Sequence, residues 1–488
     1  MSRIDCGKVK GEDYILTESD KIEIAQKVVP NASAEAISLL DGYYGFEGHD
    51  NILGLQVDYE NKKFTRLAGA AGKEAGDDFD RFPMYGGMKR CNVSNSGTIT
   101  AFYGDDDYID DGTNGQVMVY IPKFYYKVVP LKLEHIKAPG FGCHIRKANY
   151  YITDKHLAGF KVHPAFINEQ GEEVDYFLYS AYEGSLYISD TGKYYNDADY
   201  KPHTVTSADM ISSVAGKKPV TGQAVSVNDG NGVNLYRRTA EECANNRGNG
   251  WHDQTVKSLS ALQFLMMIEF GSLNVQSALG MGVCNIGKDY LINFSAITGS
   301  TLSLGNKSGI AALTTYQYYD KTTNKTVTEN QTAVNKVSVS YRGIENPYGN
   351  IFKWIQGVNF WGDGNMAGGQ AYICDDFNFI DNKNNDNYSH VGFTVMNAET
   401  TSDYISAFGY GNEKYDWVFL ATEINGTSAL PVGDKAYGAV DFNSFGAMNT
   451  GGAWNSINAA GIFSQSSNLA SNYKNCHIGC RIIYLPQD

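Results

Sequence analysis

The chain has 488 residues, of which 42% are hydrophobic and 19% are charged, a composition typical of a globular protein with a sizeable core. Its formal net charge of −14 repels phosphate backbones, so we do not expect it to bind nucleic acid. No apolar run approaches the roughly 20 residues that a membrane helix needs, so we do not expect membrane insertion.

The aromatic and glycine content favours strands and loops over long helices. The chain holds 34 Tyr, 23 Phe and 52 Gly but only 11 Pro, which indicates a β-rich architecture with many loops. Its 8 cysteines are mostly far apart, as free buried thiols are. The first ten residues lack the basic-then-apolar order of a secretory signal. We therefore expect the chain to be made and folded in a cytoplasm.

Residues 1–45 form a short helical segment. The pattern predicts one helix near residues 22–29, ended by Pro30, and a second over 34–40, ended by Asp41-Gly42. Both helices have narrow apolar faces, so we expect this segment to pack on something rather than to fold alone.

Residues 46–133 change to a pattern of short strands. Ile52–Tyr59 and Val117–Val129 are the clearest, and Pro122 within the second marks an edge or a bulge. The acidic run at 105–111 lacks the ligand order of an EF-hand, so it is interpreted as a solvated loop rather than a calcium site. The sequence predicts a small β-rich domain here.

Residues 134–488 show no comparable break and are predicted to form one large domain. Thr255–Phe270 is the strongest helix of the chain, with Asp253 or Thr255 as its cap and Gly271 as its end. Glu269 lies on this apolar helix, so we expect it to have a partner that the sequence does not identify. Residues Trp417–Ile424 are predicted to form a strand.

The end of the chain holds a long uncharged segment between two anchors. Trp454 follows Gly451-Gly452, and Ile478–Leu485 is rich in residues that favour a strand. The 23 positions between them, 455–477, include five Asn, five Ser and only one formal charge, Lys474. Loops this long are usually functional or disordered, and a terminal strand argues against disorder. A recognition loop is predicted, and a solvated loop without a partner is the alternative.

The composition of residues 455–477 favours binding over catalysis. Asn and Ser donate and accept hydrogen bonds without a fixed charge, and antibody loops combine such side chains with aromatic ones. Acid–base catalysis would need a carboxylate or a tuned histidine, and the segment holds no Asp or Glu. The candidate ligand-binding residues are the anchor with the polar and aromatic side chains that follow it: Trp454, Asn455, Ser456, Ile457, Asn458, Phe463, Ser464, Gln465, Ser466, Ser467, Asn468, Tyr473, Asn475 and His477.

Three short stretches carry a resemblance to a known fold. Gly349–Trp354 (GNIFKW), Gly451–Trp454 (GGAW) and Ile478–Arg481 (IGCR) resemble the C-type lectin-type fold of formylglycine-generating enzymes and of the variable proteins of diversity-generating retroelements. Ala453 and Cys480 depart from the usual Ser and Phe. The resemblance implies an α+β class: a large lectin-type domain with few helices and many loops over 134–488, after the small β-rich domain and the helical segment.

A second resemblance concerns the residues before that domain. Phe64–Leu67, Phe79–Pro83, Gly86–Met88 and Gly115–Phe124 resemble the N-terminal part of tail proteins from gut-bacterial phages. This implies a phage tail protein in the virion, made in the host bacterial cytoplasm, whose residues 1–133 attach a lectin-type domain to other tail proteins. The expected partner is a host cell-surface protein or glycan, a homotrimer is expected by analogy, and residues 455–477 would match the diversified segment.

An enzyme is the competing interpretation, and the residues do not favour it. Formylglycine-generating enzymes place two cysteines where ungapped matching puts Gly461 and Ser466, so no thiolate is available there. The common hydrolase, metalloprotease and nucleotide-binding motifs are absent. His252-Asp253 suggests a triad fragment, but a helix cap explains Asp253. Asp375-Asp376 and Glu423 could cleave a glycosidic bond, although no spacing selects them.

A metal site at the closing strand is also not favoured. Cys476, His477 and Cys480 match no strong zinc signature, and the two cysteines suit a buried core. We therefore expect no catalytic residue, no cofactor and no metal. A tail enzyme acting on surface glycan and a purely structural tail component remain the alternatives to a receptor-binding protein.

Overall fold

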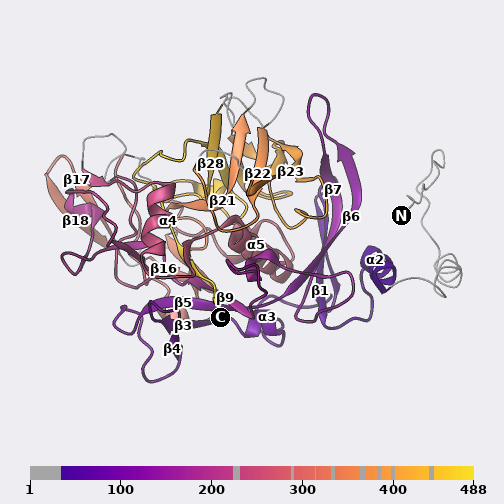
Figure 1. Ribbon diagram of the computed structural model, residues 1–488, viewed down its shortest axis with the longest axis horizontal. Helices are drawn as coiled ribbons and strands as arrows, with labels where there is room; N and C mark the ends of the chain where they lie inside the picture. The colour runs from indigo at the N-terminus through magenta and orange to yellow at the C-terminus, as the bar shows by residue number, and fades with distance from the viewer. Residues whose placement is uncertain are drawn as a thin grey trace, which may run out of the picture.

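The protein is mostly β with few helices, as the ribbon of the computed structural model shows (Figure 1). The structure describes residues 34–223, 231–286, 291–313, 315–330, 336–362, 369–381, 386–396, 402–438 and 444–487. Its helices are α2 (Ala34–Tyr44), α3 (Pro83–Gly86), α4 (Arg237–Asn245), α5 (Val256–Phe270) and α6 (Val275–Leu279), with 3-10 turns η2 (Pro164–Phe166), η3 (Asp197–Asp199), η4 (Leu302–Leu304) and η5 (Ile457–Ala459).

The larger sheets each combine strands from distant parts of the chain. One sheet has the order β2 (Lys63–Ala68), β1 (Ile52–Asp58), β7 (Cys143–Thr153), β25 (Ala407–Tyr410) and β26 (Ala421–Glu423), with β6 (Tyr125–His135) on β7 and β8 (Lys161–Val162) on β6. A second has the order β15 (Trp251–Asp253), β31 (Ile482–Tyr484), β9 (Tyr176–Ser180), β5 (Gln116–Pro122), β3 (Lys89–Val93) and β4 (Ile99–Phe102).

The third large sheet holds most of the C-terminal residues. Its order is β23 (Tyr388–Val395), β22 (Gly369–Cys374), β21 (Phe352–Gly362), β28 (Ser444–Thr450), β29 (Gln465–Leu469), β27 (Lys435–Tyr437) and β24 (Ser402–Tyr404), with β30 (Ile478–Gly479) parallel to β21. Smaller sheets join β11 (Lys193–Tyr194), β10 (Ser185–Ile188) and β13 (Met210–Ser212); β12 (Pro202–His203) and β14 (Gly232–Val233); β16 (Gly309–Ala312), β19 (Val337–Tyr341) and β20 (Ile344–Glu345); and β17 (Thr315–Asp320) and β18 (Lys325–Asn330).

Helix α5 lies between these sheets and is the centre of the core (Figure 1). Thr255 caps its N-terminus by accepting from the Ser258 backbone N–H, and Gly271 ends it in the left-handed region with φ 63°. The helix is apolar around its circumference, and every residue from Val256 to Glu269 is buried. The predicted helix is therefore confirmed, with Thr255 rather than Asp253 as its cap.

The expected partner of Glu269 is Arg342. The Glu269 carboxylate is fully buried and accepts from Arg342 Nε at 2.8 Å, Arg342 Nη2 at 2.7 Å and the Tyr341 hydroxyl at 2.9 Å. Its Oε1 also accepts from the Gly76 N–H at 3.0 Å. Burial and the nearby Glu269 charge together raise the pKa of Tyr341 well above its ordinary value. This cluster ties the end of α5 to residues near the start of the chain.

The expected boundary between residues 133 and 134 is not a boundary of the fold. It falls inside β6, which forms a long hairpin with β7 (Figure 1). The second sheet also pairs β5 of the expected small domain with β9 of the expected large one. Residues 46–133 thus share their sheets and core with later residues, because their own strands are too few to bury both faces.

Several element boundaries differ from those expected. Helix α2 continues to Tyr44 rather than ending before Asp41-Gly42, and the region near Pro122 separates β5 from β6. Only Ala421–Glu423 of the expected strand 417–424 is extended in a sheet. The helix expected near residues 22–29 lies outside the described residues. In the part of the chain that the structure describes, no helix has the length and apolarity needed to cross a bilayer.

Candidate functional site

Residues 455–477 are not one open loop, as the sequence analysis expected. They contain η5, then a turn, then strand β29, which lies between β28 and β27 in the interior of a sheet. Asn449 pairs with Ser466 on one side of β29, and Ala436 pairs with Gln465 on the other. The polar segment therefore supplies a structural strand, and only parts of it lie at the surface.

The burial of the fourteen candidate residues divides them into three groups. Those that are buried are Trp454, Phe463, Ser464, Gln465, Ser466, Ser467 and Asn475. Those that are exposed are Ile457, Asn458, Asn468 and Tyr473, while Asn455, Ser456 and His477 are partly exposed. Successive side chains of a strand point to opposite faces, and Gln465, Ser466 and Ser467 are all buried, so both faces of β29 are covered at these residues.

The buried aromatic residues act as the frame of the segment. Trp454 is fully buried and its ring lies 6.2 Å from that of Phe294. The His477 ring packs edge-on against Phe352, with centroids 5.7 Å apart. Burial lowers the pKa of His477 to about 3, so its imidazole is neutral at ordinary pH. Trp454 and Phe463, which were expected to contact a ligand, instead hold the segment in place.

Asp434 holds the turn before β29 by accepting a backbone hydrogen bond from it. The Phe463 backbone N–H donates to Asp434 Oδ2 at 2.8 Å, and Gln263 of α5 donates to the Ile462 carbonyl at 3.0 Å. A Cβ atom at Gly461 would lie 2.0 Å from Asp434 Oδ1, so only glycine fits there. Burial raises the pKa of Asp434 well above its ordinary value. The central helix and a buried acid thus position the turn at residues 461–463.

A small hollow adjoins the end of the segment. It has a volume of about 210 Å³ and is lined by Lys474 together with Pro202, His203, Thr204, Gly222, Gln223, Asn231, Gly232, Val233 and Asn234. Lys474 Nζ donates to Asn234 Oδ1 at 2.5 Å, and the neighbouring Asn475 Nδ2 donates to the Tyr473 hydroxyl at 2.8 Å. The exposed Tyr473 therefore stands beside a polar depression.

The two cysteines of the closing strand face different parts of the core. Cys476 packs in the cluster that includes Trp454, whereas Cys480 packs in the cluster that includes Trp251. They are not positioned as two ligands of one ion. Among the described residues, no group of three or more His, Cys, Asp or Glu side chains is placed to hold a metal ion.

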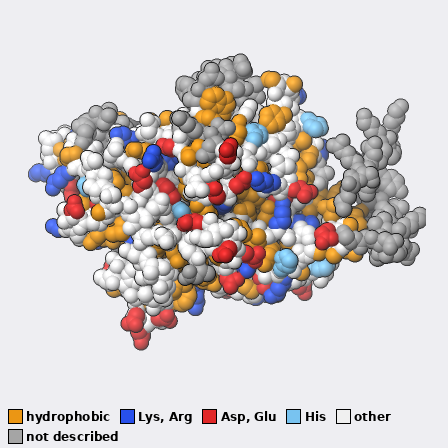
Figure 2. All heavy atoms as spheres, in the orientation of Figure 1, with side chains coloured by type: hydrophobic (Ala, Val, Ile, Leu, Met, Phe, Trp, Pro, Cys, Tyr) orange, Lys and Arg blue, Asp and Glu red, His pale blue; other side chains and the backbone are white. Residues whose placement is uncertain are grey.

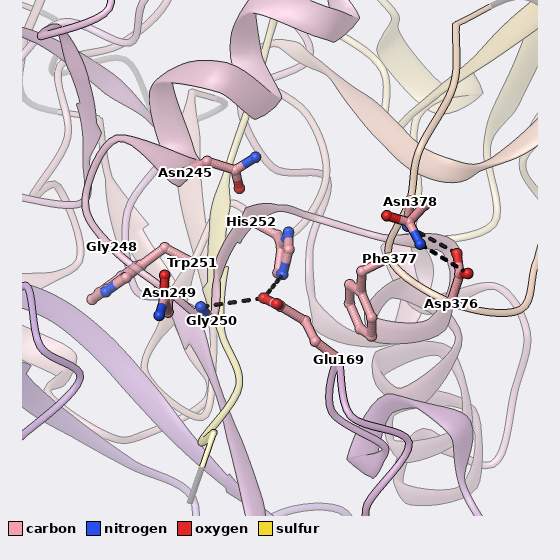
Figure 3. A pocket seen from close by; sticks show the side chains of 10 residues that line it. All are labelled: Glu169, Asn245, Gly248, Asn249, Gly250, Trp251, His252, Asp376, Phe377 and Asn378. Carbon is pink, nitrogen blue, oxygen red and sulfur yellow. Dashed lines mark hydrogen bonds and ion pairs between the residues drawn. The ribbon is translucent and has the colours of Figure 1, made fainter.

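A second site, which the sequence analysis did not predict, surrounds His252 (Figure 3). His252 lies on β15 and is 5% exposed. Its Nδ1 lies 2.7 Å from Glu241 Oε1 of α4, and its Nε2 lies 2.8 Å from Glu169 Oε1.

The sequence showed only His252-Asp253 side by side. Asp253 is neither a helix cap nor a partner of His252, since its carboxylate accepts from Gln254 N–H at 2.9 Å and from the Gln356 side chain.

The two carboxylates make the stability of the fold depend on pH at His252. Burial alone would lower the pKa of His252, but Glu241 and Glu169 outweigh it and raise the pKa to about 9. The unfolded value is about 6.5, so this stabilisation is present below pH 6.5 and is lost as the pH rises through 9.

We expect the wild type to lose about 3 kcal/mol more unfolding free energy between pH 6 and pH 10 than His252→Gln does. Urea unfolding of both proteins across this range measures the difference. Parallel pH profiles would show that the imidazole is not charged in the folded state.

Comparison with known proteins finds no matching family model and no matching curated protein. Among solved structures, the chain is similar to the Major Tropism Determinant P3c variant, at 11% identity and a TM-score of 0.25, over 81% of this chain and 71% of that one. It is also similar to the Major Tropism Determinant U1 variant, at 12% identity and a TM-score of 0.25, over 86% and 77% of the two chains. At such TM-scores the superposition does not establish a common fold.

Proposed function

We propose that this chain is a non-enzymatic receptor-binding protein of a phage tail, with a C-type lectin-type domain that presents the surface part of residues 455–477 to a host-cell ligand. One observation carries the proposal: the three motif stretches meet at the base of that segment. Gly349 N–H donates to the Gly451 carbonyl at 2.7 Å, and Trp454 N–H donates to the Asn350 carbonyl at 3.1 Å. Phe352 pairs with Ile478 in parallel register.

This contact between the three stretches supports a lectin-type arrangement, because they are far apart in the sequence and no local interaction would bring them together. Both ends of the segment are fixed near the start of β21, because Thr450 pairs with Lys353 and Ile478 pairs with Phe352, as a presented recognition surface requires. The exposed Ile457 adds support, since it is a β-branched residue with φ 53° and is 50% exposed. Such a conformation is strained and tends to persist where function requires it.

The exposed side chains indicate how the ligand would be recognised. Asn458 and Asn468 offer amide donors and acceptors, and Tyr473 offers a ring with a hydroxyl. On the face shown in Figure 2, Lys and Arg side chains are scattered among Asp and Glu rather than gathered into a basic patch. A neutral polar surface of this kind suits a host-surface protein or glycan better than a nucleic acid.

The remaining parts of the proposal concern assembly and variation. We place the chain in the virion tail, as a homotrimer attached to other tail proteins through its N-terminal residues. A trimer would present several weak sites together, and linked sites can gain about 10²–10⁴ in avidity. Adenine-directed mutagenesis would then vary Asn458 and Asn468. A reverse transcriptase gene and a near-copy of the 451–481 coding segment in the neighbouring DNA would test this point.

Removal of the exposed side chains should abolish attachment without unfolding the protein. We expect the triple variant Asn458→Ala, Asn468→Ala, Tyr473→Ala to bind a panel of gut-bacterial cells at least tenfold more weakly than the wild type, because its polar contacts are removed. Flow cytometry with labelled protein measures this, and thermal unfolding checks the fold.

The matched control changes an asparagine and a tyrosine of similar exposure elsewhere. Asn425 is exposed, and Tyr103 is 39% exposed compared with 37% for Tyr473. The variant Asn425→Ala, Tyr103→Ala should bind cells as the wild type does. Undiminished binding by the triple variant would disprove this placement of the receptor site.

A further inference from the structure

Two neighbouring hollows lie along helix α4, whose first residue, Arg237, donates its backbone N–H to the Ser471 carbonyl of residues 455–477 at 3.3 Å. One hollow of about 320 Å³ is lined by Glu169, Asn245, Gly248, Asn249, Gly250, Trp251, His252, Asp376, Phe377 and Asn378 (Figure 3). A second, of about 480 Å³, is lined by Arg238, Glu241, Glu242, Asn245, Gln356, Phe379, Ile380 and Asp381. The hollows share Asn245, and Glu241 of the second contacts His252 of the first, so they adjoin each other, and together they are called the groove.

The two walls of the groove have different origins. The first wall is one face of α4, because Arg238, Glu241 or Glu242, and Asn245 follow the three- and four-residue spacing that places side chains on one side of a helix. The second wall is the segment after β22, where Asp376, Phe377, Asn378 and Phe379 alternate polar and aromatic side chains. In Figure 3 Phe377 lies beside Glu169 and His252, with Asp376 and Asn378 farther from them.

Most of the charged side chains that line the groove are paired with an oppositely charged side chain of the protein itself. His252 lies between Glu169 and Glu241, Arg238 pairs with Glu242 at 2.9 Å, and Arg237 pairs with Asp381 at 3.1 Å. Asp376 accepts from the Asn378 N–H at 2.9 Å and from its Nδ2 at 3.0 Å. Burial raises the pKa of Asp376, but the hydrogen bonds from Asn378 and the nearby Lys257 ammonium outweigh it, so the pKa lies below its ordinary value. His252, Arg238 and Arg237 thus engage four of the five carboxylates that line the two hollows, and many oriented hydrogen-bond donors and acceptors remain there.

The aromatic residues add apolar surface at the centre. Phe377 packs on the His252 ring with centroids 4.7 Å apart, and Phe379 lies 5.7 Å from Phe377. Both rings are only partly buried, so part of each ring faces the groove. Small-molecule sites combine apolar ring surface with a few fixed polar groups in this way.

We propose that this groove binds a neutral oligosaccharide. A sugar chain presents hydroxyls to the carboxylates and amides and C–H surface to the rings of Phe377 and Phe379. A cationic peptide fits less well, because the carboxylates are already engaged by His252, Arg238 and Arg237. The two hollows in line suit a chain of several sugars rather than one. No residue that lines the two hollows belongs to residues 455–477, and the proposal does not depend on the proposed receptor role.

The test uses the full chain and an array of neutral hexose and N-acetylhexosamine oligosaccharides, with sulfated oligosaccharides and a lysine-rich peptide as comparison probes. We expect the wild type to bind a neutral oligosaccharide and the variant Asn245→Ala, Asn378→Ala to bind it at least tenfold more weakly. Both amides are exposed, so their loss should leave the melting temperature unchanged.

Two further measurements make the result decisive. The variant Asn412→Ala, Asn425→Ala removes exposed amides outside the groove, and the triple variant at Asn458, Asn468 and Tyr473 alters only the receptor segment; both should retain the sugar affinity. Hydrogen exchange of the wild type with the bound sugar should slow within residues 238–245 and 376–381. Absence of neutral-sugar binding, binding unaffected by the groove variant, or stronger binding of the charged probes would overturn the proposal.

Discussion

Replacing Arg342 with methionine is expected to lower the free energy of unfolding by about 3–5 kcal/mol, because it leaves the buried carboxylate of Glu269 without its cation. Arg342 donates to Glu269 through both Nε and Nη2, and its Nη1 also reaches Asp80 Oδ1 at 2.6 Å and the Tyr85 carbonyl at 3.2 Å. Methionine keeps much of the side-chain volume, so the loss reports the stranded charge rather than a cavity.

Urea unfolding followed by circular dichroism measures this loss, and Arg238→Met is the matched control. Arg238 is exposed and pairs with Glu242 on the surface of α4, an arrangement worth less than about 1 kcal/mol. The double variant Arg342→Met, Glu269→Gln removes the stranded charge and should recover part of the stability. Equal stabilities of the two arginine variants would contradict a buried charge cluster at the end of α5.

Replacing Trp454 with alanine is expected to lower the unfolding free energy by about 3–5 kcal/mol, because it opens a cavity where the frame of residues 455–477 meets the core. The indole is fully buried, and the Trp454 carbonyl accepts from the Ile286 N–H at 2.8 Å. Phenylalanine fills part of the space, so Trp454→Phe should lose less.

Thermal and urea unfolding measure the stability. Cell binding, measured well below the melting temperature, distinguishes a structural role of Trp454 from direct contact with the ligand. If Trp454 only supports the segment structurally, Trp454→Phe should bind cells as the wild type does, whereas the triple variant at Asn458, Asn468 and Tyr473 should not. A variant Trp454→Phe that stays folded but loses attachment would place the indole in the ligand contact instead.

Local signals gave the central helix correctly. Thr255, the apolar run after it and Gly271 determine where α5 begins and ends, since capping and left-handed glycine are decided within one turn of the chain. The Glu269 side chain on that helix also predicted a buried partner. Its identity, Arg342, could not be predicted, because 73 residues separate the two and only the packing of α5 against β19 and its turn brings them together.

The sequence predicts part of the local geometry at residues 451–481, and their role as a binding site stays a prediction. The motif stretches at 349–354, 451–454 and 478–481 were recognised as a set, and they do meet at the base of the segment. The strand β29 was missed because Gln465–Leu469 reads QSSNL, which lacks the β-branched and aromatic residues typical of strands. The pairing with β28 and β27 overrides that weak local preference.

The sequence by itself determined the composition-level and local features of this protein: the β-rich class, the central helix with its caps, and an uncharged Asn- and Ser-rich segment between fixed ends. Only the tertiary structure decided which amides of that segment reach solvent, and that Glu169 and Glu241 meet at His252. The reason is physical, since exposure and charge pairing depend on neighbours brought by other strands and helices. Glu169, for example, lies 83 residues from the imidazole that it contacts.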